Sequence, residues 1–173
     1  MHSISIFGWK RNNLKEYLDK CYLLSKKLAE MNYTIYTGGG TGYMEQGNKG
    51  AFDVDTKKSI AVIPKALYDI EIPNKYIGQL KVVPTFAERK KLLMENKKAI
   101  VIFPGGMGTM DEFTDLLNIL KTGELKTVPK IYLVGTKYWG SLKDWFIKNT
   151  NTWPEDYVNL ITDDIQEILN DLQ

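Results

Sequence analysis

The sequence predicts an α/β protein: a three-layer sandwich in which helices cover both faces of a central parallel sheet. Short apolar runs alternate along the chain with longer stretches whose apolar residues recur every three to four positions. Strands that alternate with helices form right-handed βαβ units, and such units place their strands in parallel. A length of 173 residues fits one domain, over 1–173, and no linker, repeat or low-complexity stretch divides it.

The first half of the chain contains four expected strands, over 3–7, 33–37, 59–63 and 81–83, and three expected helices, over 14–31, 43–52 and 85–96. The first of these helices carries an Asn13-x-x-Glu16 cap and the third a Thr85-x-x-Glu88 cap. The stretch 64–78 is expected to be irregular, because two prolines interrupt it.

The second half continues the alternation. Strands are expected over 99–103 and 130–134, and helices after the glycine turn 104–112, over 142–148 and over 165–172. The helix after the glycine turn carries an apolar stripe of Phe113, Leu116, Leu117 and Leu120. In parallel sheets of this kind, ligands bind at the carboxyl ends of the strands near the topological switch point.

Composition excludes several classes of protein. Lys and Arg number 23 against 21 Asp and Glu, without a basic run, so the net charge argues neither for nor against nucleic acid, and no nucleic-acid partner is expected. The chain starts directly with a strand, without a signal peptide, and no apolar stretch is long enough to cross a membrane. Cys21, the single cysteine, excludes an internal disulfide and lies on an apolar helical face, where we expect a small core residue. A cytoplasmic protein without a membrane partner is expected.

The shortage of histidine and cysteine limits the chemistry. His2 is the only histidine. With a single cysteine, this excludes the usual zinc site and any Ser-His or Cys-His catalytic pair, so no metal is expected. Catalysis must then be carried out by carboxylates, Arg, Lys, Tyr or hydroxyl groups.

The most informative segment is Pro104-Gly105-Gly106-Met107-Gly108-Thr109-Met110-Asp111-Glu112. It joins a strand to a helix through a glycine turn, an arrangement that directs backbone N–H groups at an anion. The hydroxyl of Thr109 and the carboxylate of Glu112 lie at the same turn, which suggests chemistry on a phosphorylated small molecule. Thr109-x-x-Glu112 also fits a capping box with a purely structural role. Three glycines within 105–108 favour phosphate binding, because a plain cap does not need them.

Another glycine turn lies earlier in the chain, over 38–42, and also follows a strand; it is the first glycine turn along the chain, and 104–112 contains the second. It lacks the spacing of the dinucleotide fingerprint, and no Gly-Lys-Ser/Thr follows as in a Walker P-loop. Both turns should lie on the carboxyl edge of the sheet. Together they suggest a mononucleotide or sugar phosphate held between two loops.

These motifs resemble those of a known family. The segment GGGTGYMEQGNKGA over 38–51, the pair Arg89-Lys90, and PGGMGTMDE over 104–112 are similar to the lonely-guy (LOG) cytokinin riboside 5′-monophosphate phosphoribohydrolases, once described as lysine decarboxylases. The resemblance covers nearly the whole chain. It implies a Rossmann-like fold, a homodimer with the site near the subunit interface, and no cofactor. The implied activity is hydrolysis of the N-glycosidic bond of a nucleoside 5′-monophosphate, which gives free base and ribose 5-phosphate.

The resemblance also assigns residues. Its catalytic pair falls on Arg89 and Glu112. The expected phosphate- and substrate-binding residues are Gly39, Gly40, Thr41, Glu45, Lys90, Gly105, Gly106, Gly108 and Thr109.

The chemistry of these residues fits the reaction. Cleavage of a ribosyl C–N bond passes through an oxocarbenium-like state that a carboxylate stabilises. Glu112 is expected in the first helical turn, where the helix dipole favours its ionised form, so we expect a base or cation stabiliser that positions water. Arg89 would hold phosphate or ribose oxygens and cannot act as an acid. The proton donor to the leaving base is open, with Glu45 and Asp111 as candidates.

Other interpretations of single residues are open. Without the resemblance, Arg89 reads as an ordinary exposed helix arginine, and Lys97-Lys98 as a solvated face. Tyr138-Trp139 is expected to pack at a helix start. Trp9 occupies a position where the family often has a serine near the phosphate, and its ring either narrows the pocket or moves that loop aside.

The leading hypothesis is a phosphoribohydrolase that acts on AMP or N6-substituted AMP. The alternative is a non-catalytic protein of the same superfamily that binds or carries a nucleotide or the molybdenum cofactor. Lysine decarboxylation is not expected, because no lysine lies in a recognisable pyridoxal-phosphate context.

Overall fold

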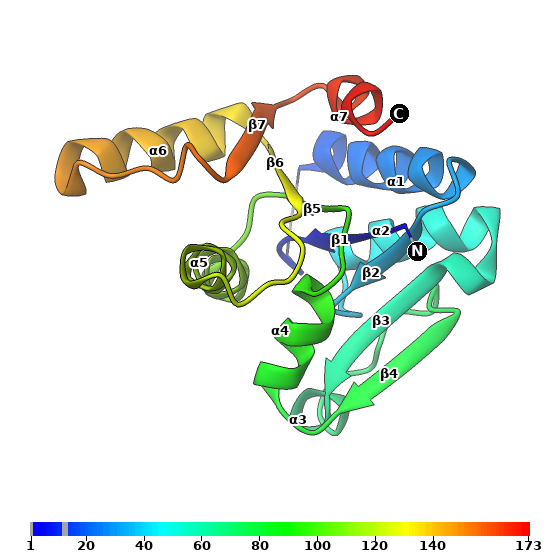
Figure 1. Ribbon diagram of the computed structural model, residues 1–173. Coiled ribbons are helices and arrows are strands. Elements are labelled where there is room, and N and C mark those ends of the chain that lie inside the picture. The colour runs from blue at the N-terminus through cyan, green and yellow to red at the C-terminus, as the bar shows by residue number, and fades with distance from the viewer. Residues whose placement is uncertain (1, 12–13) are drawn as a thin grey trace.

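The computed structural model describes residues 2–11 and 14–173. Its centre is a seven-stranded sheet of parallel strands in the order β4-β3-β2-β1-β5-β6-β7 (Figure 1). The strands are β1 (Ser3–Phe7), β2 (Thr34–Thr37), β3 (Ser59–Pro64), β4 (Gln79–Val83), β5 (Ala99–Ile102), β6 (Lys130–Val134) and β7 (Val158–Thr162). The helices are α1 (Lys15–Glu30), α2 (Tyr43–Val54), η1 (Thr56–Lys58, 3-10), α3 (Lys65–Tyr68), α4 (Phe86–Met94), α5 (Met107–Thr122), α6 (Thr136–Thr150) and α7 (Ile165–Asp171). The predicted Rossmann-like α/β fold is confirmed.

The strand order creates one topological switch point. From β1 the chain steps outward through β2 and β3 to β4, and then crosses back to β5 on the other side of β1. Ile4 of β1 therefore pairs with Ile35 of β2 on one side and Ala99 of β5 on the other. The connections leaving β1 and β5 diverge to opposite faces, so a crevice is expected beyond their carboxyl ends.

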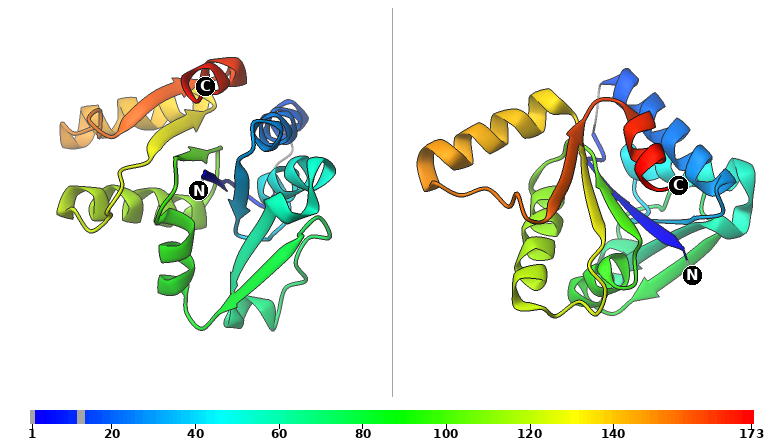
Figure 2. Two further views of the ribbon diagram at one scale, coloured as in Figure 1. Left: turned by 45° about the vertical axis from the view of Figure 1, so that its right-hand side comes forward. Right: turned by 45° about the horizontal axis from the view of Figure 1, so that its top comes forward.

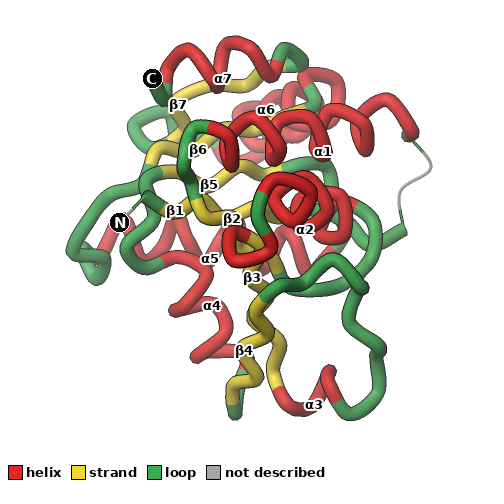
Figure 3. The backbone as a smooth tube through the Cα atoms, turned by 90° about the vertical axis from the view of Figure 1, so that its right-hand side faces the viewer, coloured by secondary structure: helices red, strands yellow, loops and turns green. Residues whose placement is uncertain are grey.

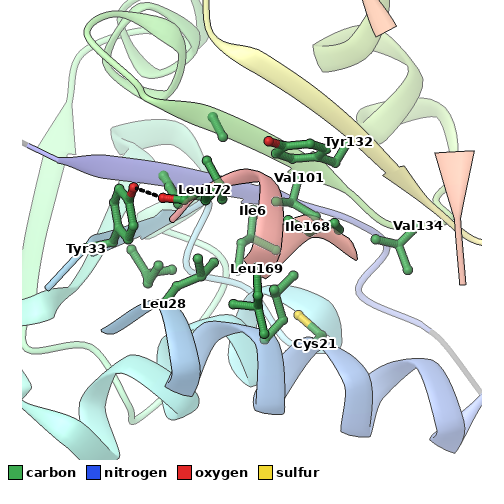
Figure 4. Close-up of a cluster of buried hydrophobic side chains, with 14 of the residues drawn as sticks. Ile6, Cys21, Leu28, Tyr33, Val101, Tyr132, Val134, Ile168, Leu169 and Leu172 are labelled. Atoms are coloured by element: carbon green, nitrogen blue, oxygen red, sulfur yellow. Dashed lines mark hydrogen bonds between the residues drawn. The ribbon is translucent and has the colours of Figure 1, made fainter. Parts of the chain in front are cut away.

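Alternate residues of the central strands enter two separate cores, one on each face of the sheet. Val101 of β5 packs with α1, α2 and α7, whereas its neighbour Ile100 packs with α4, α5 and α6. Figure 2 shows α1 and α2 on one side of the sheet and α4 and α5 on the other. In the first core Cys21 is completely buried beside Ile168 and Leu169, as expected of a small core residue (Figure 4).

Lys97, just before β5, differs from its expected role. Only 6% of this residue is exposed. Its Nζ donates hydrogen bonds to the carbonyls of Leu92 (2.7 Å) and Glu95 (3.0 Å), at the end of α4, and lies 4.1 Å from the centroid of the Tyr36 ring. The expectation of a solvated face is therefore wrong for Lys97 and right for Lys98, which is exposed.

Several elements depart from the sequence prediction, among them the short η1, which was not expected. Strand β7 was not expected, because it lies at the sheet edge with only Thr162 fully buried, and so lacks an apolar run. Helix α6 begins at Thr136 rather than near 142, and includes the buried Trp139, which packs as expected. The irregular stretch 64–78 contains the short helix α3, directly after β3 (Figure 3).

Helix caps were partly predicted. The side chain of Thr85 accepts a hydrogen bond from the backbone N–H of Glu88, as expected. The predicted Asn13 cap of α1 lies outside the described residues.

Within the part of the chain that the structure describes, no helix combines the length and apolar character of a membrane span.

Candidate active site

A cavity of about 320 Å³ lies at the switch point, beyond the carboxyl ends of β1, β2, β3 and β5. Both glycine turns reach it, together with the loop after β1, the segment after α3, and helices α4 and α5. Its lining residues are Gly8, Trp9, Lys10, Gly38, Gly39, Gly40, Met44, Ile63, Leu67, Glu71, Ile72, Pro73, Phe86, Arg89, Gly106, Met107, Gly108, Thr109 and Glu112.

Arg89 of α4 and Glu112 of α5 face each other in this cavity. Nη1 of Arg89 lies 3.7 Å from Oε1 of Glu112, and the two side chains are 12% and 11% exposed. Nε of Arg89 donates a hydrogen bond to the carbonyl of Val62 at 3.2 Å, which fixes the guanidinium against the end of β3. The interpretation of Arg89 as an ordinary exposed helix arginine is therefore wrong.

Gly38 leaves the space that the arginine occupies. A Cβ at this position would overlap Nη2 of Arg89. The first glycine turn thus admits the guanidinium as well as a ligand. This contact brings together the turn after β2, helix α4 and helix α5.

Burial controls the protonation of Glu112. Only 8% of the residue is exposed, and this burial raises the pKa of its carboxyl to about 7. The charge of Arg89 opposes that rise, the charge of Asp111 adds to it, and that of Lys90 lowers the pKa again. Near neutral pH both forms of Glu112 are populated, so the group can accept a proton and later return it.

The expected position of Glu112 in its helix is wrong. Helix α5 begins at Met107, with Gly106 as its N-cap residue, and no acidic residue lies in its first turn. Glu112 lies in the second turn, where the dipole effect has declined. The helix dipole was expected to keep Glu112 ionised. Instead, desolvation is the largest effect, and it raises the pKa of the carboxyl.

The second glycine turn leaves its helix end uncapped by any side chain. Gly106 makes no side-chain cap hydrogen bond, so the capping-box interpretation of Thr109 and Glu112 is wrong. The first N–H groups of a helix have no partner within the helix, and here Gly106, Met107, Gly108 and Thr109 line the cavity. This geometry suits an anion such as a phosphate.

A buried amide network holds the first glycine turn. Nδ2 of Asn74 donates to the carbonyls of Gly39 (3.2 Å) and Gly40 (3.0 Å) and to Oδ1 of Asn48 (3.0 Å). The hydroxyl of Thr37 also donates to Oδ1 of Asn48, at 2.5 Å. Sequence reasoning assigned no role to these side chains, although asparagines near a glycine turn are a signal for such a brace.

The structure divides the predicted site residues into two groups. Seven line the cavity: Gly39, Gly40, Arg89, Gly106, Gly108, Thr109 and Glu112. Four others are not among its lining residues: Thr41, Glu45, Lys90 and Gly105. Of these, the hydroxyl of Thr41 donates to the carbonyl of Lys10 at 3.0 Å.

Two of the other outlying residues support the second glycine turn and α5. Lys90 forms ion pairs with Asp111 (3.3 Å) and Asp115 (3.1 Å) and so ties α4 to α5. Gly105 lies against the Thr109 side chain, leaving no space for a Cβ. Asp111, one of the two candidate proton donors, thus pairs with Lys90 outside the cavity.

Several lining residues were not predicted. Met44, Ile63, Leu67 and Phe86 form apolar parts of the wall. Nζ of Lys10 pairs with Oε1 of Glu71 at 2.6 Å, joining the loop after β1 to the segment after α3. The sequence places Lys10 and Glu71 far apart, in stretches with no motif, and only the fold brings them together.

The fold and site define the class: a doubly wound α/β protein with a ligand cavity at its switch point, between two glycine turns. Within that class the chain belongs to the LOG family. Residues 44–172 match the family model with the description "Possible lysine decarboxylase".

Curated relatives carry nucleotide-hydrolase names. The chain is 29% identical over 117 residues to the cytokinin riboside 5′-monophosphate phosphoribohydrolase LOG1 of Arabidopsis thaliana, covering 67% of this chain and 54% of the relative. It is 28% identical over 157 residues to the pyrimidine/purine nucleotide 5′-monophosphate nucleosidase of Escherichia coli K12. This match covers 84% of this chain and 34% of the relative. The chain thus spans about half the length of the first relative and a third of the second.

Solved structures share the fold. The molybdenum cofactor carrier protein of Chlamydomonas reinhardtii superimposes with a TM-score of 0.72 at 18% identity, over 99% of this chain and 96% of that one. At this identity the likeness concerns the fold alone.

Proposed function

We propose that this protein hydrolyses the N-glycosidic bond of a nucleoside 5′-monophosphate, AMP or an N6-substituted AMP, to free base and ribose 5-phosphate. The observation that carries the proposal is the buried Arg89–Glu112 pair in the same cavity as the uncapped start of α5. A phosphate binder alone needs no buried carboxylate beside its anion. The names of the curated relatives support the same reaction.

The phosphate binds at the first turn of α5, where N–H groups of 106–109 are directed at it. The ribose then lies near Glu112 and Arg89. As the C–N bond lengthens, positive charge develops on the ribose, and the ionised carboxylate of Glu112 stabilises it. Glu112 accepts a proton from the water that attacks C1′, and Arg89 orients ribose or phosphate oxygens through charge-assisted hydrogen bonds.

The proton for the leaving base comes from the cavity wall. Neither Glu45 nor Asp111 lines the cavity, whereas Glu71 and Lys10 do. We therefore assign the donor role to the Lys10–Glu71 pair in place of the two residues first considered. Thr41, Lys90 and Gly105 act on the substrate indirectly, by fixing the loops and helices that contact it.

A homodimer is part of the proposal. Large apolar side chains at the cavity are exposed in the single chain: Ile72 is 93%, Met107 87% and Phe86 48% exposed. A second copy over this region would remove them from water and enclose the substrate. The free, buried Cys21 fits the reducing cytoplasm, where we place the protein.

One second candidate is a carrier without turnover. The molybdenum cofactor carrier of Chlamydomonas reinhardtii shares the fold, so the fold is compatible with this alternative. Glu112 distinguishes the two, because hydrolysis needs its carboxylate and binding does not.

The test is release of free base from a panel of nucleoside 5′-monophosphates, including AMP and N6-isopentenyl-AMP, with lysine as a negative control substrate. Wild type should release base, whereas Glu112→Gln should bind the nucleotide without releasing it. Arg89→Ala should lose both turnover and affinity. If wild type binds these nucleotides and none is cleaved, the hydrolase is excluded and the carrier is supported.

A further inference from the structure

We propose that the indole N–H of Trp9 is a ligand of the substrate phosphate, completing the anion site at the start of α5. This inference rests on the proposed function, because it assumes that a phosphomonoester binds at the uncapped end of α5. The resemblance places this position near the phosphate, and the inference adds a binding role for the indole that occupies it here.

The backbone of Trp9 is held between the two glycine turns. Its N–H donates to the carbonyl of Pro104 at 3.2 Å, at the start of the second turn. Its carbonyl accepts a hydrogen bond from the N–H of Tyr43 at 3.3 Å, at the start of α2. A Cβ at Gly42, whose φ is +66°, would overlap that carbonyl, so the first turn also packs closely on it. The loop after β1 is therefore tied to both glycine turns.

The Trp9 ring lies over the N-cap residue of α5. From the point where a Cβ of Gly106 would lie, Nε1 of Trp9 is at 3.5 Å and Cδ1 at 3.8 Å. The edge of the ring that carries the N–H thus borders the helix end where the anion binds. The ring forms part of the cavity wall.

The N–H of this indole is available to a ligand. The buried Trp139 donates its Nε1–H to the carbonyl of Val134 at 3.1 Å, as buried tryptophans usually do. Among residues 2–11 and 14–173, the Trp9 indole N–H has no hydrogen-bond acceptor. Trp9 lines the cavity and is 46% exposed. A donor held by its backbone, beside the free N–H groups of α5, is pre-organised for a phosphoryl oxygen.

The indole recognises the phosphate, not the nucleoside. A hydrogen bond to an ionised acceptor is stronger than one between neutral groups, and its loss should weaken binding of a phosphomonoester roughly tenfold or more. Compounds without a phosphate should not be affected.

The experiment uses ribose 5-phosphate, which binds without turnover and does not absorb where tryptophan is excited. Its dissociation constant is measured by calorimetry for wild type, Trp9→Phe and Trp145→Phe, and its effect on tryptophan fluorescence is recorded. Trp9→Phe keeps an aromatic ring and removes the N–H. Trp145→Phe is the matched control, because Trp145 is exposed on α6 and does not line the cavity.

We expect ribose 5-phosphate to change the tryptophan fluorescence of wild type and of Trp145→Phe. The fluorescence of Trp9→Phe should not respond to the ligand. The dissociation constant of Trp9→Phe for ribose 5-phosphate should rise roughly tenfold, whereas that of Trp145→Phe should equal the wild-type value. Equal affinity of Trp9→Phe and wild type, or no binding to wild type, would overturn the inference. Trp9-dependent binding without hydrolysis of any nucleotide would support it while rejecting the hydrolase.

Discussion

The guanidinium of Arg89 and the carboxylate of Glu112 lie 3.7 Å apart in a nearly buried position, and yet the pKa of Glu112 is raised to about 7. A neighbouring cation alone would lower that pKa. The distance exceeds that of a close ion pair, and the loss of solvent around Glu112 outweighs the attraction. The pair therefore holds a carboxyl that changes its protonation near neutral pH, as expected of an acid–base group.

The first prediction concerns the pH dependence of turnover. If ionised Glu112 is required, kcat/KM should rise with pH through about 7 and then level off. Arg89→Ala should shift this rise to higher pH, because Arg89 lowers the pKa of Glu112, and should reduce kcat/KM by about 10²–10³-fold.

Initial rates of base release from pH 5 to 9 measure both effects. Lys91→Ala serves as the control, since Lys91 lies on the same helix with its side chain 66% exposed. A pH profile of Arg89→Ala that rises at the same pH as wild type would refute the electrostatic coupling.

The second prediction concerns stability. The folded-state pKa of Glu112 is raised, so its stabilising contribution is full below the unfolded-chain pKa and is lost as pH rises through about 7. Above that pH wild type buries a charge. Glu112→Gln should therefore increase the free energy of unfolding by about 1–3 kcal/mol at pH 8, and by much less near pH 4. Urea denaturation at the two pH values measures this; a variant less stable than wild type at pH 8 would contradict it.

The third prediction uses Gly38. Gly38→Ala should displace the guanidinium of Arg89 and lower kcat/KM by roughly 10–100-fold, because small misplacements of catalytic groups are costly. Gly140→Ala is the matched control: nothing lies within 4 Å of its added Cβ, and it should leave turnover unchanged and stabilise α6 by about 0.5–1 kcal/mol. Equal rates for the two variants would show that the position of Arg89 is not critical.

The fourth prediction concerns Lys97. Burial, with the charge of nearby Lys81, lowers the pKa of Lys97 to about 8 in the folded protein. The folded state then binds this proton less tightly than the unfolded chain, so wild type should gain stability as pH rises from about 8 to 10. Relative to Lys97→Met, that gain should be about 1–3 kcal/mol.

Unfolding by urea at pH 7.5 and 10 tests this for wild type and Lys97→Met, with Lys98→Met as the exposed neighbour. The Lys98→Met protein should follow wild type. A constant difference in unfolding free energy between wild type and Lys97→Met at both pH values would argue against a buried amine with a lowered pKa.

The sequence by itself determined the parallel sheet and the shared edge of the two glycine turns. The parallel sheet and the shared edge can be predicted because the periodicity of apolar residues is a local property of each segment, and βαβ units are right-handed. The order of the strands in the sheet places Gly39 and Gly106 at the same cavity. Strand β7 was missed because an edge strand buries little surface and so carries little pattern.

Tertiary structure alone decided which polar groups are buried. Arg89 and Lys97 read as exposed helix and surface residues, yet both are enclosed by segments distant in the sequence. Glu112 was expected to be ionised on the local argument of a helix dipole, and the surrounding segments raise its pKa instead. The free energy of a charge depends on the solvent and dipoles in every direction around it, and that environment exists only once the chain has folded.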